Sequence, residues 1–425
     1  METRGDHRLI EPVDGNPWDI DAYISVGGYE AWKKCLRTLS PEQIIEELKL
    51  SKLRGRGGAG YPTAAKWDAV TNASDGERYF VCNAGEHEPG TFKDRYLLQT
   101  IPHQLIEGCL IASRAARATR SYIYVNHEYR EETERLKMAL GQARAWGLVG
   151  PNVMGSGVSI DLQILEGHGS YVAGEETAML EAIQGRPALP REKPPYPTDI
   201  GLYGKPTLVN NVETLCNVPR IIRKGAAWFT QVGTEQCPGT MMFSLSGSVM
   251  RPGVYEMPMG TSIRELIERC GGGPLPGRTV KAVFPGGPAF AMVKADKLDL
   301  SMDFDSLKKA GSGLGSAGVI VIDDATCIVR TVLEFSTFFK NESCGQCAPC
   351  RTGTEQMAVA MTKLEAGQGT EEDMKSLLEL CGMVKGTGYC TLVTGAARLV
   401  QSAVKHFRAE FEEHARLGRC PYPTS

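Results

Sequence analysis

The sequence lacks any excess of basic charge. Its 425 residues include 47 lysines and arginines against 50 aspartates and glutamates, which gives a net charge of −3. A protein that binds nucleic acid through phosphates needs a basic surface, and a lipid-binding tract needs clustered basic residues. We therefore expect no nucleic-acid partner and no direct binding to a charged lipid surface.

Long apolar runs are also lacking. No run approaches the roughly 18 residues of a membrane span. The opening stretch METRGDHRLIEPVDGNP has no apolar core of a signal peptide. We expect a cytoplasmic protein without a membrane span, whose association with the inner face of the cell membrane would come through partner proteins.

A disulfide framework is not expected either. The 13 cysteines are an odd number in a long chain without an export signal. Most are isolated in apolar company, as Cys82, Cys109 and Cys216 are, and these are predicted to be small buried hydrophobes. The cysteines that need another explanation lie in ESCGQCAPCR, residues 342–351.

The order of predicted elements divides the chain into an α/β, an α+β and an all-α part. Helices over 41–53, 101–120 and 130–147 alternate with strands over 78–86, 121–126 and 159–167, and 208–235 reads as a further helical piece. This alternation predicts a largely parallel sheet. A hairpin, a short helix and strands follow over 240–325, and the chain from 330 lacks strand signals.

The cysteine run has the spacing of an iron–sulfur site. Cys344, Cys347 and Cys350 form C-x-x-C-x-x-C, which suits three corners of a cubane cluster. Of the cysteines downstream, Cys381 lies on an apolar helical stripe and Cys420 in the RCPYP tail. We favour Cys390 as fourth ligand, because the glycines of KGTGYC free the backbone to turn. A structural zinc site is the alternative.

A glycine-rich loop precedes the first strand. Gly55, Gly57 and Gly60 match G-x-G-x-x-G, but a charged helix stands before the loop and Pro62 follows it, so the Rossmann context is absent. Bare backbone amides beside Arg54, Arg56 and Lys66 could still approach a phosphate or a flat ring. A plain turn is the alternative.

Two acidic stretches follow predicted strands. They are CNAGEHEPGTFKDR, residues 82–95, and GHGSYVAGEETAML, residues 167–180, where Glu175 and Glu176 open a helix. Carboxylates at that position often only cap the helix. Beside an electron-transfer cluster they could instead bind ribose hydroxyls.

Six blocks in order carry a family resemblance. GRGGAGYPTAAKW, CNAGEHEPGTFKDR, YVAGEETAML, KPTLVNNVET, ESCGQCAPCRTGT and the GTGYC loop make the chain resemble, over residues 24–412, the NADH-binding flavoprotein subunit of respiratory complex I and its soluble diaphorase relatives. The resemblance implies a Rossmann-like FMN domain with the N-terminal segment (1–240), a ubiquitin-like, SLBB-like β-grasp domain (241–328) and a helical bundle carrying a 4Fe–4S cluster (329–425).

The resemblance also implies the site. The residues expected at FMN are Gly55, Arg56, Gly57, Gly58, Lys66, Asn83, Glu86, Gly174, Glu175, Glu176, Asn210, Asn211 and Thr214. NADH would meet Tyr61, Glu86, Glu88, Glu175, Glu176, Lys193 and Tyr196, with Glu86 and Glu175 as candidate catalytic residues. The cluster would lie on Cys344, Cys347, Cys350 and Cys390.

The implied activity is NADH:quinone oxidoreductase. Hydride passes from NADH to FMN, then single electrons pass to the cluster and onward to a thioredoxin-like 2Fe–2S subunit and a larger iron–sulfur subunit. The alternative is a diaphorase subunit of a soluble formate dehydrogenase, hydrogenase or electron-bifurcating complex. We favour the respiratory form because only about 40 residues precede the glycine loop region and the chain ends soon after the cluster helices. A non-catalytic, metal-stabilised binding module is a further alternative.

Three positions depart from the family pattern. Gly85 stands where a carboxylate is usual, Ala69 where a second aromatic would help to hold the adenine, and Ala173 where many relatives have cysteine. His87, in the same loop as Gly85, could be a new contact, but we expect it to be a spacer that faces solvent. These departures bear on nucleotide affinity.

Overall fold

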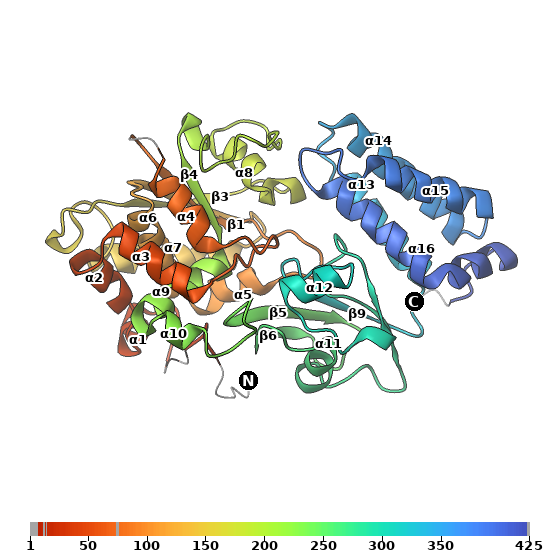
Figure 1. The fold of residues 1–425 in the computed structure, drawn as a ribbon, viewed down its shortest axis with the longest axis horizontal. Helices are drawn as coiled ribbons and strands as arrows, with labels where there is room; N and C mark the ends of the chain where they lie inside the picture. Colours follow the sequence, from red (N-terminus) through yellow and green to blue (C-terminus); the bar gives the residue numbers. More distant parts are fainter. Residues whose placement is uncertain (1–6, 12, 14, 74–75, 423–425) are drawn as a thin grey trace.

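The computed structural model describes residues 7–11, 13, 15–73 and 76–422. Three bodies follow one another along the chain (Figure 1): an α/β body, a smaller body around a second sheet, and four helices that end the chain. We propose 1–240, 241–328 and 329–425 as their bounds. The first boundary falls at the start of β5 (Thr240–Gly247) and the second at the start of α13 (Ile328–Asn341).

The first body is built on a parallel sheet. Its strands are β1 (Tyr79–Ala84), β2 (Arg120–Val125), β3 (Asp161–Glu166) and β4 (Thr207–Asn211), in the order β3-β2-β1-β4. All pairs are parallel, which confirms the predicted sheet. The prediction of helix alone over 208–235 is wrong at its start. The short segment TLVNN pairs with β1 as β4, because alternate side chains pack on both faces of the sheet.

Helices cover both faces of this sheet. The helices of the first body are α1 (Ile20–Ser25), α2 (Glu30–Arg37), α3 (Pro41–Ser51), α4 (Thr63–Thr71), α5 (Lys93–Thr100), α6 (Pro102–Ala115), α7 (Arg130–Ala145), α8 (Glu176–Ile183), α9 (Val212–Lys224) and α10 (Ala226–Phe229). Phe80 and Cys82 of β1 pack with α6 and α9, whereas Tyr79 and Val81 pack with α8. The 3₁₀ turns are η1 (Val153–Gly155), η2 (Tyr171–Gly174) and η3 (Leu202–Gly204).

The strand order reverses beside β1. The chain runs from β1 outward to β2 and β3, then returns to place β4 on the other side of β1. In open parallel sheets, ligands bind outside the carboxyl ends of the strands where the order reverses. The crevice between the ends of β1 and β4 is therefore the first place to look for a site.

The second body is a mixed five-stranded sheet. Its elements are β5, β6 (Gly253–Pro258), α11 (Ile263–Glu265), a π-helical turn (Leu266–Cys270), β7 (Val280–Phe284), β8 (Val293–Lys294), a 3₁₀ turn (Ala295–Lys297), α12 (Phe304–Lys309) and β9 (Gly318–Asp323). The strand order is β6-β5-β9-β7-β8. The antiparallel pair β5 and β6 is the predicted hairpin, and α11 is the predicted short helix.

Glu256 of β6 fastens the N-terminal segment to the second body. Its carboxylate accepts hydrogen bonds from the backbone amides of Arg8, Leu9 and Ile10 at 2.6–3.1 Å, and it pairs with His7. Burial alone would raise the pKa of Glu256, but these donors and Thr240 hold it below its usual value. An ionised carboxylate thus ties the start of the described chain to a strand far along the sequence.

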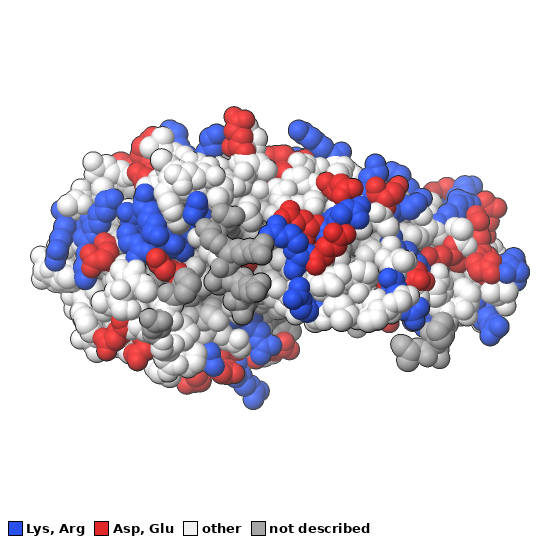
Figure 2. Space-filling model, turned by 90° about the horizontal axis from the view of Figure 1, so that it is seen from below, with Lys and Arg blue, Asp and Glu red and all other residues white. Residues whose placement is uncertain are grey.

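The third body consists of α13, α14 (Ala348–Glu365), α15 (Glu371–Val384) and α16 (Leu392–Leu417). Cys381 is buried beside Met357, as its apolar stripe predicted. Acidic and basic side chains are interspersed over the helical end of the face in Figure 2. Among the described residues, no helix is both long and apolar enough to cross a membrane.

Candidate functional site

A cavity of about 250 Å³ lies at the carboxyl ends of β1 and β4. It is lined by Gly57, Asn83, Gly85, Glu86, His87, Glu88, Thr91, Asp94, Tyr171, Val172, Gly174, Glu175, Asn211, Ser316, Cys390, Thr391 and Leu392. All three bodies contribute to this wall. The structure therefore brings the glycine loop, both acidic stretches and the predicted fourth cysteine to one place.

Close backbone approaches shape the cavity. A Cβ atom on Gly57 would lie 2.9 Å from Cβ of Asn211, and one on Gly174 would lie 2.6 Å from the carbonyl oxygen of Gly85. Asn83 ties the same loops, because its Nδ2 donates to the carbonyl of Gly174 at 2.8 Å. Side chains are excluded at these positions, so a flat ring could lie against bare backbone.

Glu86 is buried at the N-terminus of α5. Its carboxylate accepts hydrogen bonds from the amides of Asp94 and Arg95 at 3.0 and 3.1 Å and from the hydroxyl of Tyr129 at 3.0 Å. Burial, reinforced by the charge of Asp94, raises the pKa of Glu86 to about 7. The group therefore changes charge near neutral pH at the cavity wall.

A buried ion network stands behind Glu86. The Nζ atom of Lys93 lies 2.8 Å from Oδ1 of Asp94 and 2.9 Å from Oε2 of Glu213. Burial lowers the pKa of Lys93, but the two carboxylates outweigh burial and raise it above its usual value. Asn211 donates from Nδ2 to Asp94 at 2.5 Å, so this network fixes the end of β4.

Glu88 joins the first two bodies. The hydroxyl of Tyr171 donates to its Oε2 at 2.7 Å, and the amide of Ala289 donates to its Oε1 at 3.2 Å. Burial raises the pKa of Glu88 to about 7 despite these donors. The cavity therefore holds two carboxyl groups that titrate near neutrality.

Four of the predicted nucleotide residues form a chain of charges. Lys66 lies 3.0 Å from Glu176, while Lys193 lies 3.6 Å from Glu176 and 2.7 Å from Glu175. Burial would raise the pKa of Glu176, but Lys66 and Lys193 hold it below its usual value. Glu175 also caps α8, since its Oε2 accepts from the amides of Thr177 and Ala178. The capping interpretation is thus correct, and Glu175 still reaches the cavity.

Other predicted residues already have hydrogen-bond partners within the protein. The fully buried Arg56 side chain donates to the carbonyls of Pro238 and Thr240, while its backbone amide donates to Thr214 Oγ1 at 2.8 Å. Asn210 accepts from Trp67 Nε1 at 2.7 Å. These three residues shape the glycine loop and β4, and Arg56 can meet a ligand only through its backbone.

The remaining predicted positions are two exposed tyrosines and two glycines of the glycine loop. Tyr61 and Tyr196 are 55% and 53% exposed, and neither lines the cavity. Gly55 donates its amide to the carbonyl of Tyr61 at 2.8 Å, and Gly58 has φ +128°, which favours glycine. The glycine loop is held as a turn, with the exposed ring of Tyr61 available to a ligand.

The family departures are placed as follows. Gly85 lines the cavity, Ala69 is exposed on α4, and Ala173 is buried. The expectation that His87 faces solvent is wrong. Its ring lines the cavity and lies 3.2 Å from Asn126 Nδ2, because the loop after β1 folds back toward β2.

The four predicted cluster cysteines lie together beside the cavity. Burial raises the pKa of Cys350, and the thiolates of Cys344 and Cys347 raise it further. Burial, followed by Cys350 and Glu175, raises the pKa of Cys390 to about 11. The amide of Tyr389 lies 3.5 Å from Cys347 Sγ, which brings the two cysteine loops together.

These donors fit an iron–sulfur cluster. The four residues are thiols in C-x-x-C-x-x-C and a neighbouring loop, and a cubane cluster takes one thiolate at each of its four corners. A flavin also fits, because bare backbone at Gly57, Gly85 and Gly174 walls the cavity and leaves room for a flat ring.

Some wall residues escaped the sequence analysis. Thr91, Asp94, Tyr171 and Ser316 line the cavity without having been predicted. Asp94 and Tyr171 lie in the two acidic blocks, so position in a block could have indicated them. Ser316 comes from the second body, and nothing local in the sequence places it here.

The fold and the site define a class of protein: a flavoprotein oxidoreductase with an iron–sulfur centre beside the flavin. The Nuo51 FMN-binding domain matches residues 48–220, the SLBB domain matches 242–290, and the NADH-ubiquinone oxidoreductase-F iron-sulfur binding region matches 330–414. The chain belongs to the family of NADH-quinone oxidoreductase F subunits.

Relatives match along nearly the whole chain. The NADH-quinone oxidoreductase F 2 subunit of Rhizobium meliloti is 47% identical over 98% of both chains. The corresponding F subunit of Escherichia coli is 43% identical over 94% of this chain and 90% of its own. A crystal structure of NAD+-reducing [NiFe]-hydrogenase in the H2-reduced state has a TM-score of 0.85 and 33% identity, covering 98% of this chain and 68% of that one.

These matches decide between the sequence interpretations. The predicted family, fold class, cofactors and NADH oxidoreductase activity are confirmed. The structural zinc site and the non-catalytic binding module are therefore wrong alternatives. Because the relatives are subunits, the chain works within a larger assembly.

Proposed function

We propose that this chain is the NADH-oxidising flavoprotein subunit of a membrane-associated NADH:quinone oxidoreductase. The observation that carries the proposal is the single cavity whose wall includes both the loops of the α/β body and Cys390. FMN bound there would take a hydride from NADH and pass electrons singly to a cluster on the four cysteines.

The chain's own residues position the two nucleotides. FMN would be held by the backbone of the glycine loop (Gly55, Arg56, Gly57, Gly58), by Lys66, Asn83, Glu86, Gly174, Glu175 and Glu176, and by Asn210, Asn211 and Thr214 at β4 and α9. NADH would meet the exposed Tyr61 and Tyr196, and Glu86, Glu88, Glu175, Glu176 and Lys193. Hydride transfer needs stacked rings rather than an acid–base pair, so these residues act by orientation and charge.

Glu86 and Glu175 are the proposed catalytic residues. Each lies on the cavity wall and is fixed by backbone amides, at the start of α5 and α8. An anionic wall favours the cationic ring of NAD⁺ over neutral NADH, so these charges would tune hydride donation and product release.

The assembly is proposed from the same family. We expect a thioredoxin-like 2Fe–2S subunit and a larger iron–sulfur subunit to receive the electrons. The chain would lie at the inner face of the cell membrane through these partners. A soluble NAD-linked hydrogenase or formate dehydrogenase complex is the second candidate, because the hydrogenase structures match over almost the whole chain.

An anaerobic NADH titration of the purified chain tests the activity. We expect the visible flavin band to bleach at about one NADH per chain. Protein that folds but carries no flavin would overturn the proposal. Co-purification then separates the two assemblies: membrane subunits support the respiratory form, whereas hydrogen- or formate-handling subunits support the soluble form.

A further inference from the structure

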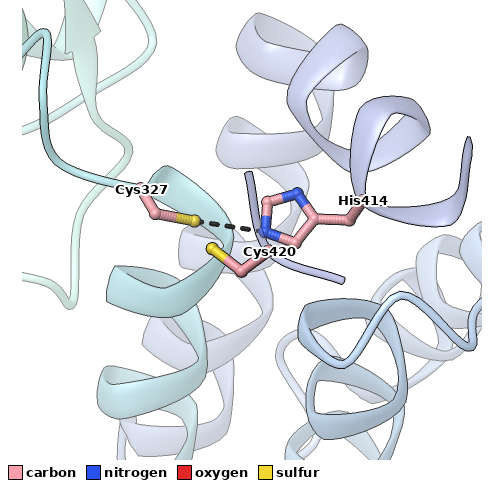
Figure 3. A group of neighbouring side chains, drawn as sticks. All are labelled: Cys327, His414 and Cys420. Atoms are coloured by element: carbon pink, nitrogen blue, oxygen red, sulfur yellow. Dashed lines mark hydrogen bonds between the residues drawn. The ribbon is translucent and has the colours of Figure 1, made fainter. Parts of the chain in front are cut away.

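Three side chains of metal-binding types lie together where the start of α13 meets the end of α16. They are Cys327, His414 and Cys420, whose ligand atoms all lie within 4.8 Å of one another (Figure 3). Cys327 Sγ and His414 Nε2 are 3.3 Å apart. None of the three belongs to the proposed cluster or lines the cavity.

The chain is folded to bring them together. Cys327 is the N-cap of α13, and His414 stands in the last turn of α16, 87 residues later. Gly418, with φ +65°, ends α16 and turns the chain back, so that Cys420 faces the other two. Cys327 and His414 are buried, and Cys420 is half-buried.

The imidazole is oriented as a ligand. His414 Nδ1 lies 2.6 Å from the carbonyl oxygen of Glu410, so this nitrogen carries the proton and donates it. Nε2 then presents a lone pair toward the two sulfurs. The Glu410 carboxylate is fixed in turn, because it accepts from the amide of Ile328 and pairs with Lys281.

Two thiols and one imidazole are the donors that zinc prefers. Tetrahedral bonds of about 2.3 Å to sulfur and about 2.0 Å to nitrogen would separate the two atoms by about 3.5 Å. The observed 3.3 Å between Cys327 Sγ and His414 Nε2 is close to that separation. The distance therefore needs little adjustment on binding.

We propose that Cys327, His414 and Cys420 bind one Zn²⁺ ion that pins the end of α16 to the start of α13. Binding displaces one proton from each thiol, and water completes the coordination beside the half-exposed Cys420. The ion acts structurally. It secures the tail up to Tyr422, whose hydroxyl lies 3.0 Å from Lys281 Nζ of the second body.

A second compact group shows why burial and proximity alone are not enough. Cys237, Asp303 and Asp305 also lie within 4.8 Å of one another. However, the Arg54 guanidinium already lies 3.2 Å from Cys237 Sγ and 2.7 Å from Asp305 Oδ2. Its positive charge takes the place that a metal ion would need.

Metal analysis and X-ray absorption at the zinc edge test the proposal on the full, cluster-containing chain, purified without chelators or a metal-affinity step. We expect about one zinc per chain, with two sulfur neighbours at about 2.3 Å and one nitrogen at about 2.0 Å. The zinc edge is blind to the iron of the cluster. This measurement on the unaltered protein needs no variant to fold.

Variants then assign the ion. Cys420→Ser should reduce zinc at least about 10-fold while iron and flavin contents stay unchanged. Cys270→Ser, which alters another half-buried cysteine, should keep its zinc. Zinc that persists in Cys420→Ser, a chain without zinc, or a Cys327–Cys420 disulfide found by mass spectrometry of unreduced protein would each overturn the proposal.

Discussion

The nucleotide side and the cysteine side of the cavity are built differently. On the nucleotide side, buried charges already have partners: Lys93 holds Asp94 and Glu213, and Glu86 accepts two backbone amides. On the cysteine side, Cys344, Cys347 and Cys390 are half-buried in loops between helices. The protein alone forms the first side, whereas metal binding completes the second.

Loss of the cluster is the largest expected effect, and it should be confined to the cysteine side. We expect Cys390→Ser to lower iron from about four atoms per chain to near zero, because a cubane needs its corner ligand. Flavin should remain and should still be bleached by NADH. Iron analysis and anaerobic spectra measure both, with Cys381→Ser as the buried control in the same body. Simultaneous loss of flavin would contradict the comparison.

Gly174→Ala should instead weaken flavin binding on the nucleotide side. The added Cβ would lie 2.6 Å from the carbonyl oxygen of Gly85, so two backbone segments must separate. Such overpacking costs about 1–3 kcal/mol, which predicts a roughly 5- to 150-fold weaker affinity for FMN. Equilibrium flavin binding measures it, and Gly141→Ala, at an exposed position with nothing within 4 Å, is the control. Equal affinities would show that the loops are not preformed.

The pH dependence of stability should show how firmly Glu86 is built into the nucleotide side. Its pKa is raised from 4.5 to about 7 in the folded chain, so the folded state holds the proton more tightly than the unfolded state. The stability contributed by protonated Glu86 is present below pH 4.5 and is lost as pH rises to about 7, by about 2–3 kcal/mol.

Glu86→Gln should flatten that decline in the free energy of unfolding between about pH 5 and pH 7, measured by urea denaturation about every half pH unit. Glu134→Gln, on the exposed side of α7, should leave the decline in place. Glu86→Gln also tests the catalytic proposal. Unchanged NADH oxidation and unchanged inhibition by NAD⁺ would remove Glu86 from the catalytic residues.

The smallest effect is expected at Tyr61. Its side chain is 55% exposed, so a stacked nucleotide would cover a ring that water now reaches. Tyr61→Ala should raise the KM for NADH about 5-fold, for a stacking loss of about 1 kcal/mol, with little change in kcat. Steady-state kinetics measure it. Trp146→Ala, just after α7 and so at the opposite end of the sheet, should change neither parameter.

The sequence predicted the features that are local along the chain. The cysteine spacing, the alternating strands of the first sheet and the glutamates opening α8 all depend on neighbours within a few residues. Strand β4 of the first sheet was missed, because the five residues TLVNN are too short to show a period of their own. Their partner β1 lies more than a hundred residues earlier.

Long-range contacts account for the rest. Nothing around Arg56 predicts that its guanidinium turns to Pro238 and Thr240, because those carbonyls lie 182 and 184 residues later in the chain. The buried ion pair of Lys93 with Glu213 could not be predicted either, because α9 lies next to Lys93 only in the folded chain. The sequence likewise did not predict that His414 and Cys420 lie beside Cys327, because α13 and α16 are adjacent only in the folded chain.

The attachment of residues 8–10 to Glu256 has a consequence for biosynthesis. The carboxylate that binds the amides of these residues lies about 250 residues later in the chain. At about 5–20 residues per second, residues 8–10 wait roughly 10 to 50 seconds after their own synthesis for this partner. They are thus secured only after the α/β body that follows them has been translated.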